Sequence, residues 1–235
     1  MSSEHLRTGT RDGVFYALID RPEKHNALAL SIIAEIGKQF RAAATDDTLV
    51  AAVLRGAGEK TFAAGGDLRE LNGLRTQAEA EQMAVDAKAS FNAIRDFPVP
   101  VIAALNGNAF GGGAELAVAC DFRVAAAHAR IGFVQGRLAL ASAWGGGPDL
   151  LDLVGRARGL KLMSTGEMLE PEQALAIGLY DAVGAPNESF DATVENFLAP
   201  IRQQKPQSMR AFKAVSDSHR RGDNRDSMHA VETAA

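Results

Sequence analysis

Residues 106–121 read NGNAFGGGAELAVACD, in which three consecutive glycines lead into an apolar segment that carries Glu115. Glycine runs cost conformational entropy and weaken any regular element, so a close approach of another group to this backbone would explain them. The apolar residues predict a buried helix that begins in the glycine run and continues through 116–120. At Gly112 the chain would pass from loop to helix, where the N–H has no intrahelical acceptor and the helix dipole adds positive charge. The stretch therefore predicts a backbone site for negative charge, or an ordinary tight turn.

Apolar runs of two kinds alternate along the rest of the chain. Short runs are typical of buried strands, and the longer segments between them have helical spacing. This alternation predicts an α/β fold with parallel strands and crossover connections. After Pro148 the segments are mostly helical, which predicts a helical layer and no second sheet domain. The predicted strands are 14–19, 50–54, 99–105 and 122–126, and the predicted helices before and after Pro148 are 27–44, 78–95, 149–154, 160–164, 171–177, 191–202 and 207–218.

Composition excludes several classes of partner. The net charge of −4 gives no broad basic face, so we expect no nucleic-acid partner. No apolar stretch approaches the ~20 residues that a membrane span needs, so no membrane partner is expected. The N-terminal MSSEHLRTGT lacks the apolar core of a secretory signal, and the single cysteine, Cys120, lies in an apolar run. These features predict a cytoplasmic protein in which Cys120 is a core residue.

The glycine-rich turns at 65–67, 107–113 and 145–147 do not fit the common nucleotide motifs. A P-loop needs a lysine directly after its final glycine, where this chain has Ala114. The dinucleotide fingerprint fails on spacing, and the G-x-S-x-G motif of serine hydrolases is absent. The five histidines are scattered and have no cysteine partners, so we expect no metal site.

The remaining interpretation of the glycine-rich turns is that they expose a pair of free backbone N–H groups. Gly66 offers a second one, in the loop after the strand predicted at 50–54. Two such donors that converge on one oxygen would form an oxyanion hole, although spacing alone favours ordinary turns. Glu115 strengthens the first interpretation, because buried glutamates are rare unless they are paired or functional. Glu115 would then be a general acid or base, and a helix-capping acid without chemistry is the alternative.

At this point the sequence resembles the crotonase superfamily, also called the enoyl-CoA hydratase/isomerase family. The matching motifs occur in the same order as in the family and cover nearly the whole chain. They are RPEKHNAL at 21–28, FAAGGDLREL at 62–71, VPVIAALNGNAFGGGAELAVACDFRVA at 99–125, IGFVQGRLAL at 131–140 and the segment from WGGGPDLLDLVG to LYDAV at 144–183.

The resemblance implies a spiral of ββα units followed by a helical C-terminal region that builds homotrimers, often paired into hexamers. We expect the spiral core with the acyl-CoA site at 1–184 and the helical region at 185–235. The last helix of the family is expected to be missing, because the chain stops at Ala235. The implied partner is an acyl-CoA thioester whose thioester oxygen binds in the oxyanion hole. Coenzyme A would be part of this substrate, and no permanently bound cofactor is expected.

The family's functional residues are implied at specific positions. Gly66 and Gly112 match the two oxyanion N–H donors, and Glu115 matches one of the two catalytic glutamates of the hydratases. The acyl pocket, or alternatively plain helix packing, would involve Leu68, Leu71 and Leu74. The resemblance implies a substrate- and CoA-binding set of Lys24, Ala27, Ala64, Gly65, Asp67, Leu68, Gly111, Gln135 and Trp144.

Two departures from the family pattern concern the chemistry. Gln135 stands where the second hydratase glutamate is expected, and an amide can hold water or a carbonyl but cannot exchange a proton. Asp67 is the nearest candidate for a second carboxylate, although beside Gly66 it is more typical of a helix cap. The usual proline-glycine turn is replaced by Ser-Ala-Trp at 142–144, which resembles a branch that decarboxylates short malonyl-type CoA thioesters.

Three functional hypotheses follow from the resemblance. The leading one is an acyl-CoA lyase similar to enoyl-CoA hydratases, with Glu115 as the acid/base and Gln135 positioning water or substrate. The second is a decarboxylase of methylmalonyl- or ethylmalonyl-CoA, which needs no second carboxylate. The third is a CoA-binding protein without catalysis, against which Glu115 and both oxyanion glycines argue. Isomerase activity is a further possibility within the family.

Overall fold

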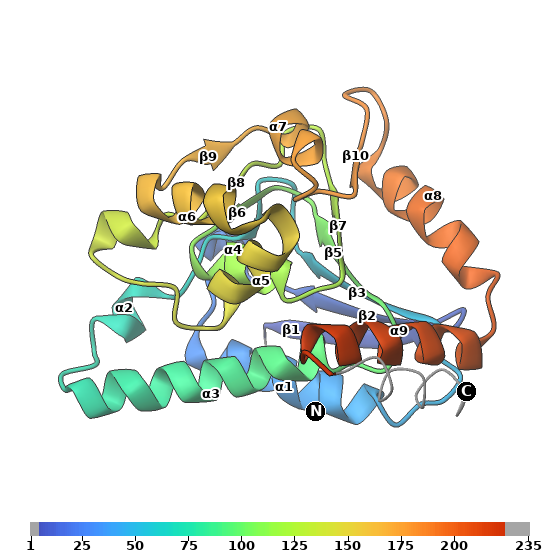
Figure 1. Ribbon diagram of the computed structural model, residues 1–235, viewed down its shortest axis with the longest axis horizontal. Coiled ribbons are helices and arrows are strands. Elements are labelled where there is room, and N and C mark those ends of the chain that lie inside the picture. The colour runs from blue at the N-terminus through green and yellow to red at the C-terminus, as the bar shows by residue number, and fades with distance from the viewer. Residues whose placement is uncertain (1–4, 224–235) are drawn as a thin grey trace.

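The computed structural model describes residues 5–223, which form two β-sheets and the helices around them (Figure 1). In the larger, six-stranded sheet, the first two strands pair antiparallel and all other neighbours pair parallel. Its strands in spatial order are β1 (Leu6–Arg11), β2 (Val14–Ile19), β3 (Ala51–Gly56), β5 (Val101–Leu105), β7 (Phe122–Ala125) and β10 (Ala182–Val183).

The smaller sheet consists of short strands that follow the strands of the larger one. Its order is β4 (Thr61–Ala63), β6 (Asn108–Phe110), β8 (Ile131–Gly132) and β9 (Met168–Leu169). Thus β3 is followed by β4, β5 by β6 and β7 by β8, and each such pair places one strand in each sheet before a helix begins. This repeat confirms the expected α/β spiral of ββα units.

The helices cover the sheets and fill the space between them. Figure 1 shows the long α3 beside α1 along one side of the larger sheet, and α4 next to α5 near the centre. Gly37 permits the contact between α1 and α3, because a Cβ there would lie 2.7 Å from the Ser90 Cα. The helices are η1 (Pro22–Lys24), α1 (Leu30–Ala43), α2 (Leu68–Leu71), α3 (Gln77–Arg95), α4 (Gly112–Val118), η2 (Gln135–Leu138), α5 (Gly146–Val154), α6 (Arg156–Thr165), α7 (Pro171–Ala176), α8 (Phe190–Arg202) and α9 (Pro206–Arg220).

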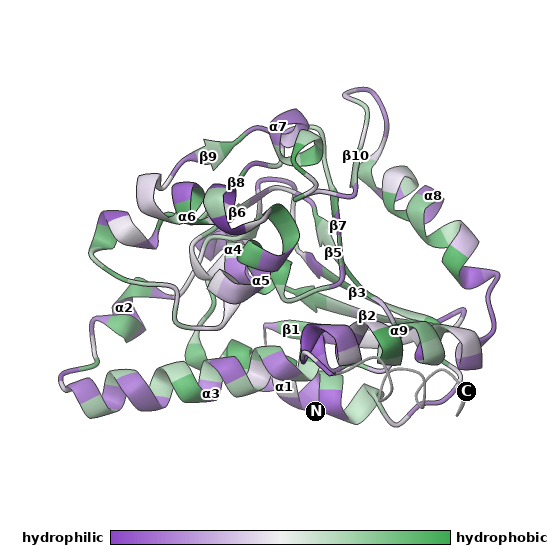
Figure 2. Ribbon diagram, in the orientation of Figure 1, coloured by the Kyte–Doolittle hydropathy of each residue, from purple (hydrophilic) through white to green (hydrophobic). Residues whose placement is uncertain are grey.

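Apolar side chains from both sheets and the helices form a continuous core. Phe40 lies edge-on to both Phe15 and Phe97, with ring centroids 5.4 and 5.2 Å apart. Figure 2 shows hydrophobic colouring on the strands of the larger sheet and hydrophilic stretches on α3 and α9. Packing against this core therefore stabilises the strands, which provide a rigid scaffold for the loops at their ends.

The structure contains the predicted strands and helices with shifted ends, and it adds β1, α2 and several short strands that were not predicted. The predicted strands correspond to β2, β3, β5 and β7. The helix predicted at 27–44 begins only at Leu30, because the Leu28 N–H donates to the Gly65 carbonyl. The helix predicted to run through 116–120 ends at Val118. The two-residue strands β9 and β10 lie in the half expected to be mostly helical, and they are too short to show a sequence period.

The C-terminal part of the described chain consists of α8 and α9, which follow β10. Residues 224–235, the rest of the region predicted at 185–235, lie outside the described residues. The division into a core and a trimer-forming region stays a prediction. No helix between residues 5 and 223 combines the length and apolar character that a membrane crossing requires.

Candidate active site

The three consecutive glycines lie where α4 approaches β4 and a tryptophan ring. Gly111 has a φ of +53°, a backbone conformation that favours glycine. A Cβ at Gly112 would overlap the Trp144 ring, and a Cβ at Gly113 would overlap the carbonyl group of Ala63 in β4. The glycine run is therefore explained by close packing on both sides of the start of α4.

One cavity of about 180 Å³ brings most of the predicted site together. Within residues 5–223, neither the Gly66 N–H nor the Gly112 N–H donates to a protein acceptor. Both glycines line the cavity and both lie against the Trp144 ring, so two free donors border one space. The predicted residues that line it are Ala64, Gly65, Gly66, Leu68, Leu71, Gly111, Gly112, Glu115, Gln135 and Trp144.

Glu115 is 2% exposed and receives hydrogen bonds from four donors. The Gln135 Nε2 donates to Oε1 at 2.9 Å, while the Ser142 Oγ donates to Oε2 at 2.8 Å. The backbone N–H groups of Trp144 and Gly146 also donate to Oε2, each at 2.9 Å. All four donors are neutral, and the two carboxylate oxygens have enough lone pairs to accept from all of them.

Glu115 also lies at the N-terminus of a second helix. Gly146 is the first residue of α5, and a Cβ there would lie 2.5 Å from the Glu115 Cγ. Glycine at this position lets the end of α5 approach closely enough for its N–H to reach the carboxylate. The positive end of the α5 dipole therefore faces Glu115.

Among residues 5–223, no second acid faces Glu115 across the cavity. Within the described chain, Glu115 is the one carboxylate that lines this space. The Asp67 carboxylate instead accepts from the Arg69 N–H as the N-cap of α2 and pairs with Arg21 at 2.9 Å. Burial raises the pKa of Asp67, but the hydrogen bonds from Arg21 and Arg69 outweigh it and hold the pKa below its ordinary value. Asp67 is therefore a helix cap, which agrees with the preference drawn from its position beside Gly66.

Trp144 forms one wall of the cavity and is 5% exposed. Its ring meets Phe91 edge-to-face at a centroid distance of 5.7 Å, and its Nε1 lies 3.3 Å from the Met83 Sδ. These contacts leave the indole little freedom to turn. The ring therefore limits the depth of the cavity beside Gly66 and Gly112.

Some predicted residues lie elsewhere, and some lining residues were not predicted. Lys24, Ala27, Leu74 and Asp67 do not line this cavity. The cavity is also lined by Met83 and Val134, and Ser142 donates a hydrogen bond to Glu115. No local pattern of the sequence predicts these three residues. A neighbouring cavity of about 670 Å³ shares Ala64 with the first and is bordered by His25, Lys60, Phe110 and His128.

The chain is similar over almost its whole length to known proteins. Residues 9–233 match the family model described as enoyl-CoA hydratase/isomerase. The short-chain-enoyl-CoA hydratase of Clostridium acetobutylicum is 34% identical over 177 residues, which are 75% of this chain and 67% of that protein. The crotonyl-CoA hydratase of Syntrophomonas wolfei is 31% identical over 217 residues, 92% of this chain and 83% of that one.

Solved structures agree with the sequence comparisons. The crystal structure of an enoyl-CoA hydratase from Bacillus anthracis superposes with a TM-score of 0.90 at 27% identity and covers 98% of this chain and 89% of that one. Fold, motif order and sequence identity point to the same relatives. The chain belongs to the enoyl-CoA hydratase/isomerase family, the crotonase superfamily.

Proposed function

We propose that the protein is a lyase that hydrates enoyl-CoA thioesters. The proposal rests on one observation, the placement of two free backbone N–H groups and one buried carboxylate on the same small cavity. The relatives from Clostridium acetobutylicum and Syntrophomonas wolfei, both more than 30% identical, are named as hydratases, which supports this reaction over others in the family. The remaining question is how one carboxylate can serve both proton-transfer steps.

In the proposed reaction the thioester oxygen accepts hydrogen bonds from Gly66 and Gly112. Glu115 takes a proton from water while the hydroxide adds to the β-carbon, and the electrons of the C=C bond move to the thioester oxygen. The same proton then passes from Glu115 to the α-carbon as the enolate collapses. Three donors already occupy Oε2, so Oε1 is the oxygen that handles the proton. Gln135 donates to Oε1 and would orient it.

Decarboxylation of a malonyl-type CoA thioester is the second candidate. Two features favour it: Glu115 is the one carboxylate that residues 5–223 place on the cavity, and the Trp144 wall leaves room for a short acyl group. In this reaction the bond to the substrate carboxylate breaks, CO₂ leaves, and its electron pair forms an enolate held by the two N–H groups. A proton from water then adds to the α-carbon, and no second protein acid is required.

The CoA part of the substrate would occupy the cavity that shares Ala64 with the first. Lys60, His25 and His128 border that space and can donate to phosphate oxygens. Lys24 ends η1 directly before His25, and Ala27 follows His25 by two residues, so the predicted CoA loop lies next to this cavity and outside the acyl site. Coenzyme A as part of the substrate, without a resident cofactor, stays part of this proposal.

Thioester assays with Glu115→Gln test the reaction. The variant keeps an oxygen for the three donors that meet Oε2, so the fold should survive. We expect hydration of crotonyl-CoA by the wild type and a loss of roughly 10²- to 10⁴-fold in kcat for the variant. Glu172→Gln, on the exposed first turn of α7, is the matched control and should retain full activity.

Other substrates decide between the alternatives. Release of CO₂ from methylmalonyl- or ethylmalonyl-CoA without hydration of crotonyl-CoA would replace the proposal by the decarboxylase. Conversion of a 3-enoyl-CoA alone would indicate an isomerase. Thermal stabilisation by CoA without turnover of any thioester would leave a CoA-binding protein without catalysis.

The assembly and location follow as proposals from family membership. A homotrimer, or a hexamer of paired trimers, is expected in solution, and sedimentation velocity of the purified chain would distinguish these from a monomer. The cytoplasmic location also stays a prediction, and fractionation of the source cells would test it.

A further inference from the structure

We propose that Arg95, at the end of α3, is a positioning residue that fixes the loop from Ser142 to Gly146 against Glu115. This loop supplies three of the four hydrogen bonds that hold the Glu115 carboxylate. Only the Gln135 bond comes from elsewhere. The geometry of the carboxylate therefore depends on whatever holds the 142–146 loop in place.

Arg95 contacts the loop from the side opposite Glu115. Its side chain is 5% exposed, and its Nη2 donates to the Trp144 carbonyl at 3.1 Å. The same guanidinium donates through Nη2 and Nε to the Asp149 Oδ2, at 2.7 and 2.9 Å. Trp144 thus donates its N–H to the Glu115 carboxylate on one side, and its carbonyl accepts from the Arg95 guanidinium on the other. A loop held at both polar groups of one residue has little freedom to shift.

The neighbouring glycine supports this arrangement. Gly145 has a φ of +94°, and a Cβ there would lie 2.8 Å from the Arg95 Nη2. The glycine therefore permits both the turn and the approach of the guanidinium. Asp149 follows in the first turn of α5, so one arginine joins the loop to the helix whose N-terminus faces Glu115.

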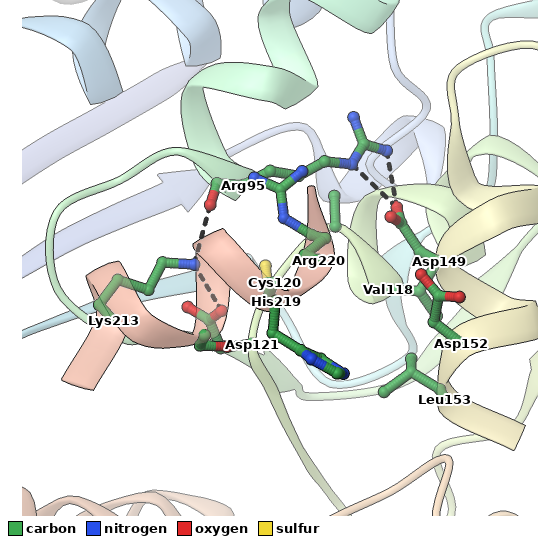
Figure 3. Close-up of a pocket in the computed structure, with 12 residues that line it drawn as sticks. Arg95, Val118, Cys120, Asp121, Asp149, Asp152, Leu153, Lys213, His219 and Arg220 are labelled. Atoms are coloured by element: carbon green, nitrogen blue, oxygen red, sulfur yellow. Dashed lines mark hydrogen bonds and ion pairs between the residues drawn. The ribbon is translucent and has the colours of Figure 1, made fainter. Parts of the chain in front are cut away.

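A residue of α9, Lys213, in turn binds the backbone carbonyl of Arg95. Figure 3 shows Lys213 pointing at the Arg95 carbonyl and at Asp121, with Asp149 on the other side of Arg95. The Lys213 Nζ is 2.8 Å from that carbonyl oxygen and 2.6 Å from the Asp121 Oδ1, and its side chain is 4% exposed. A cavity of about 470 Å³ adjoins this cluster, but Arg95 and Lys213 already bind protein acceptors there. The cluster is therefore a support and not a second ligand site.

The side chain at position 95 must be arginine for this role. Its Nη1 donates to the Asn92 side chain at 2.9 Å, so three nitrogens of one planar group serve three separate acceptors. A lysine ammonium has neither the reach nor the fixed fork for all three. The catalytic consequence rests on the proposed function, whereas the structural role of Arg95 does not.

The test compares two buried arginines that each lose one carboxylate partner. Asp149→Asn removes the carboxylate partner of Arg95. Asp181→Asn removes the carboxylate partner of Arg123, an arginine that is 1% exposed. The Arg123–Asp181 pair has a nitrogen–oxygen distance of 3.1 Å, and neither residue lines the active-site cavity. Trp144 is the single tryptophan of the chain, so its fluorescence reports on the 142–146 loop alone. Arg95→Lys is the second variant, which keeps the charge but loses the fork.

We expect Asp149→Asn and Arg95→Lys to move the emission of the folded protein to longer wavelength and to increase quenching by acrylamide. Their kcat should fall roughly 10- to 100-fold, with a smaller change in KM, because the reacting group is misplaced while the substrate still binds. Asp181→Asn should lose stability but keep the wild-type emission and kcat. Folded Asp149→Asn and Arg95→Lys with wild-type emission and kcat would overturn the proposal. A wild type without activity, together with altered emission in these variants, would support the positioning role and reject the proposed reaction.

Discussion

Two buried polar regions lie back to back in this protein, on the two sides of the 142–146 loop. Around Glu115, one charged group is surrounded by four neutral donors. Around Arg95 and Lys213, each cation meets carboxylates, namely those of Asp149, Asp121 and Asp217. In the first region the Glu115 carboxylate accepts from neutral groups and borders the cavity, whereas in the second each cation is paired with a carboxylate. Neutral donors fix a reactive group without removing its charge, and ion pairs suit a rigid support.

The largest effect on stability is expected for Lys213→Met. The variant removes the buried ammonium that pairs with Asp121 and Asp217 and leaves Asp217 the more distant Arg220 at 3.7 Å, and breaking a buried pair costs about 3–5 kcal/mol. Urea denaturation would measure the loss. The matched control is Lys161→Met, whose partner Glu167 lies 3.1 Å away on the surface and whose loss should cost about 0–1 kcal/mol. Equal costs for the two variants would show that the cluster is not a support.

A smaller loss of stability is expected for Glu115→Ala. It leaves neutral donors without their acceptor, at about 1–3 kcal/mol for each donor that stays unpaired, and water can enter the adjoining cavity to meet the others. Urea denaturation beside Lys213→Met gives the comparison directly. A Glu115→Ala protein less stable than Lys213→Met would reverse the contrast between the two regions, and would make Glu115 mainly a structural cap of α5.

The smallest effect is expected when the native protein is treated with a thiol reagent, because its one cysteine, Cys120, is buried beside the Arg95 cluster. Burial raises the pKa of its thiol to about 12, so at pH 8 the thiolate is scarce and also covered. The native protein should not react with a thiol reagent such as dithionitrobenzoate at pH 8, whereas the protein unfolded in guanidinium should release one equivalent. Labelling of the native protein would show that the cluster opens readily.

The sequence predicts the strands with clear periods and the residues of the glycine run, and the structure brings Gly66, Gly112 and Glu115 to one cavity. Ser142 and Arg95 could not be predicted, because each acts on a residue 27 or more positions away through one hydrogen bond or ion pair. Such contacts leave no periodic signal in the chain. The strands of the smaller sheet are two or three residues long and escape prediction for the same reason.

The sequence by itself determined the α/β class, the order of the family motifs and the presence of Glu115 beside free glycine N–H groups. These features are local, because hydrophobic period and glycine content act within one element or turn. Only the tertiary structure decided that Asp67 caps α2, that Gln135 bonds Glu115, and that no second carboxylate of the described chain lines the cavity. Those outcomes depend on which side chains the ββα spiral brings together, and the packing of distant elements sets that.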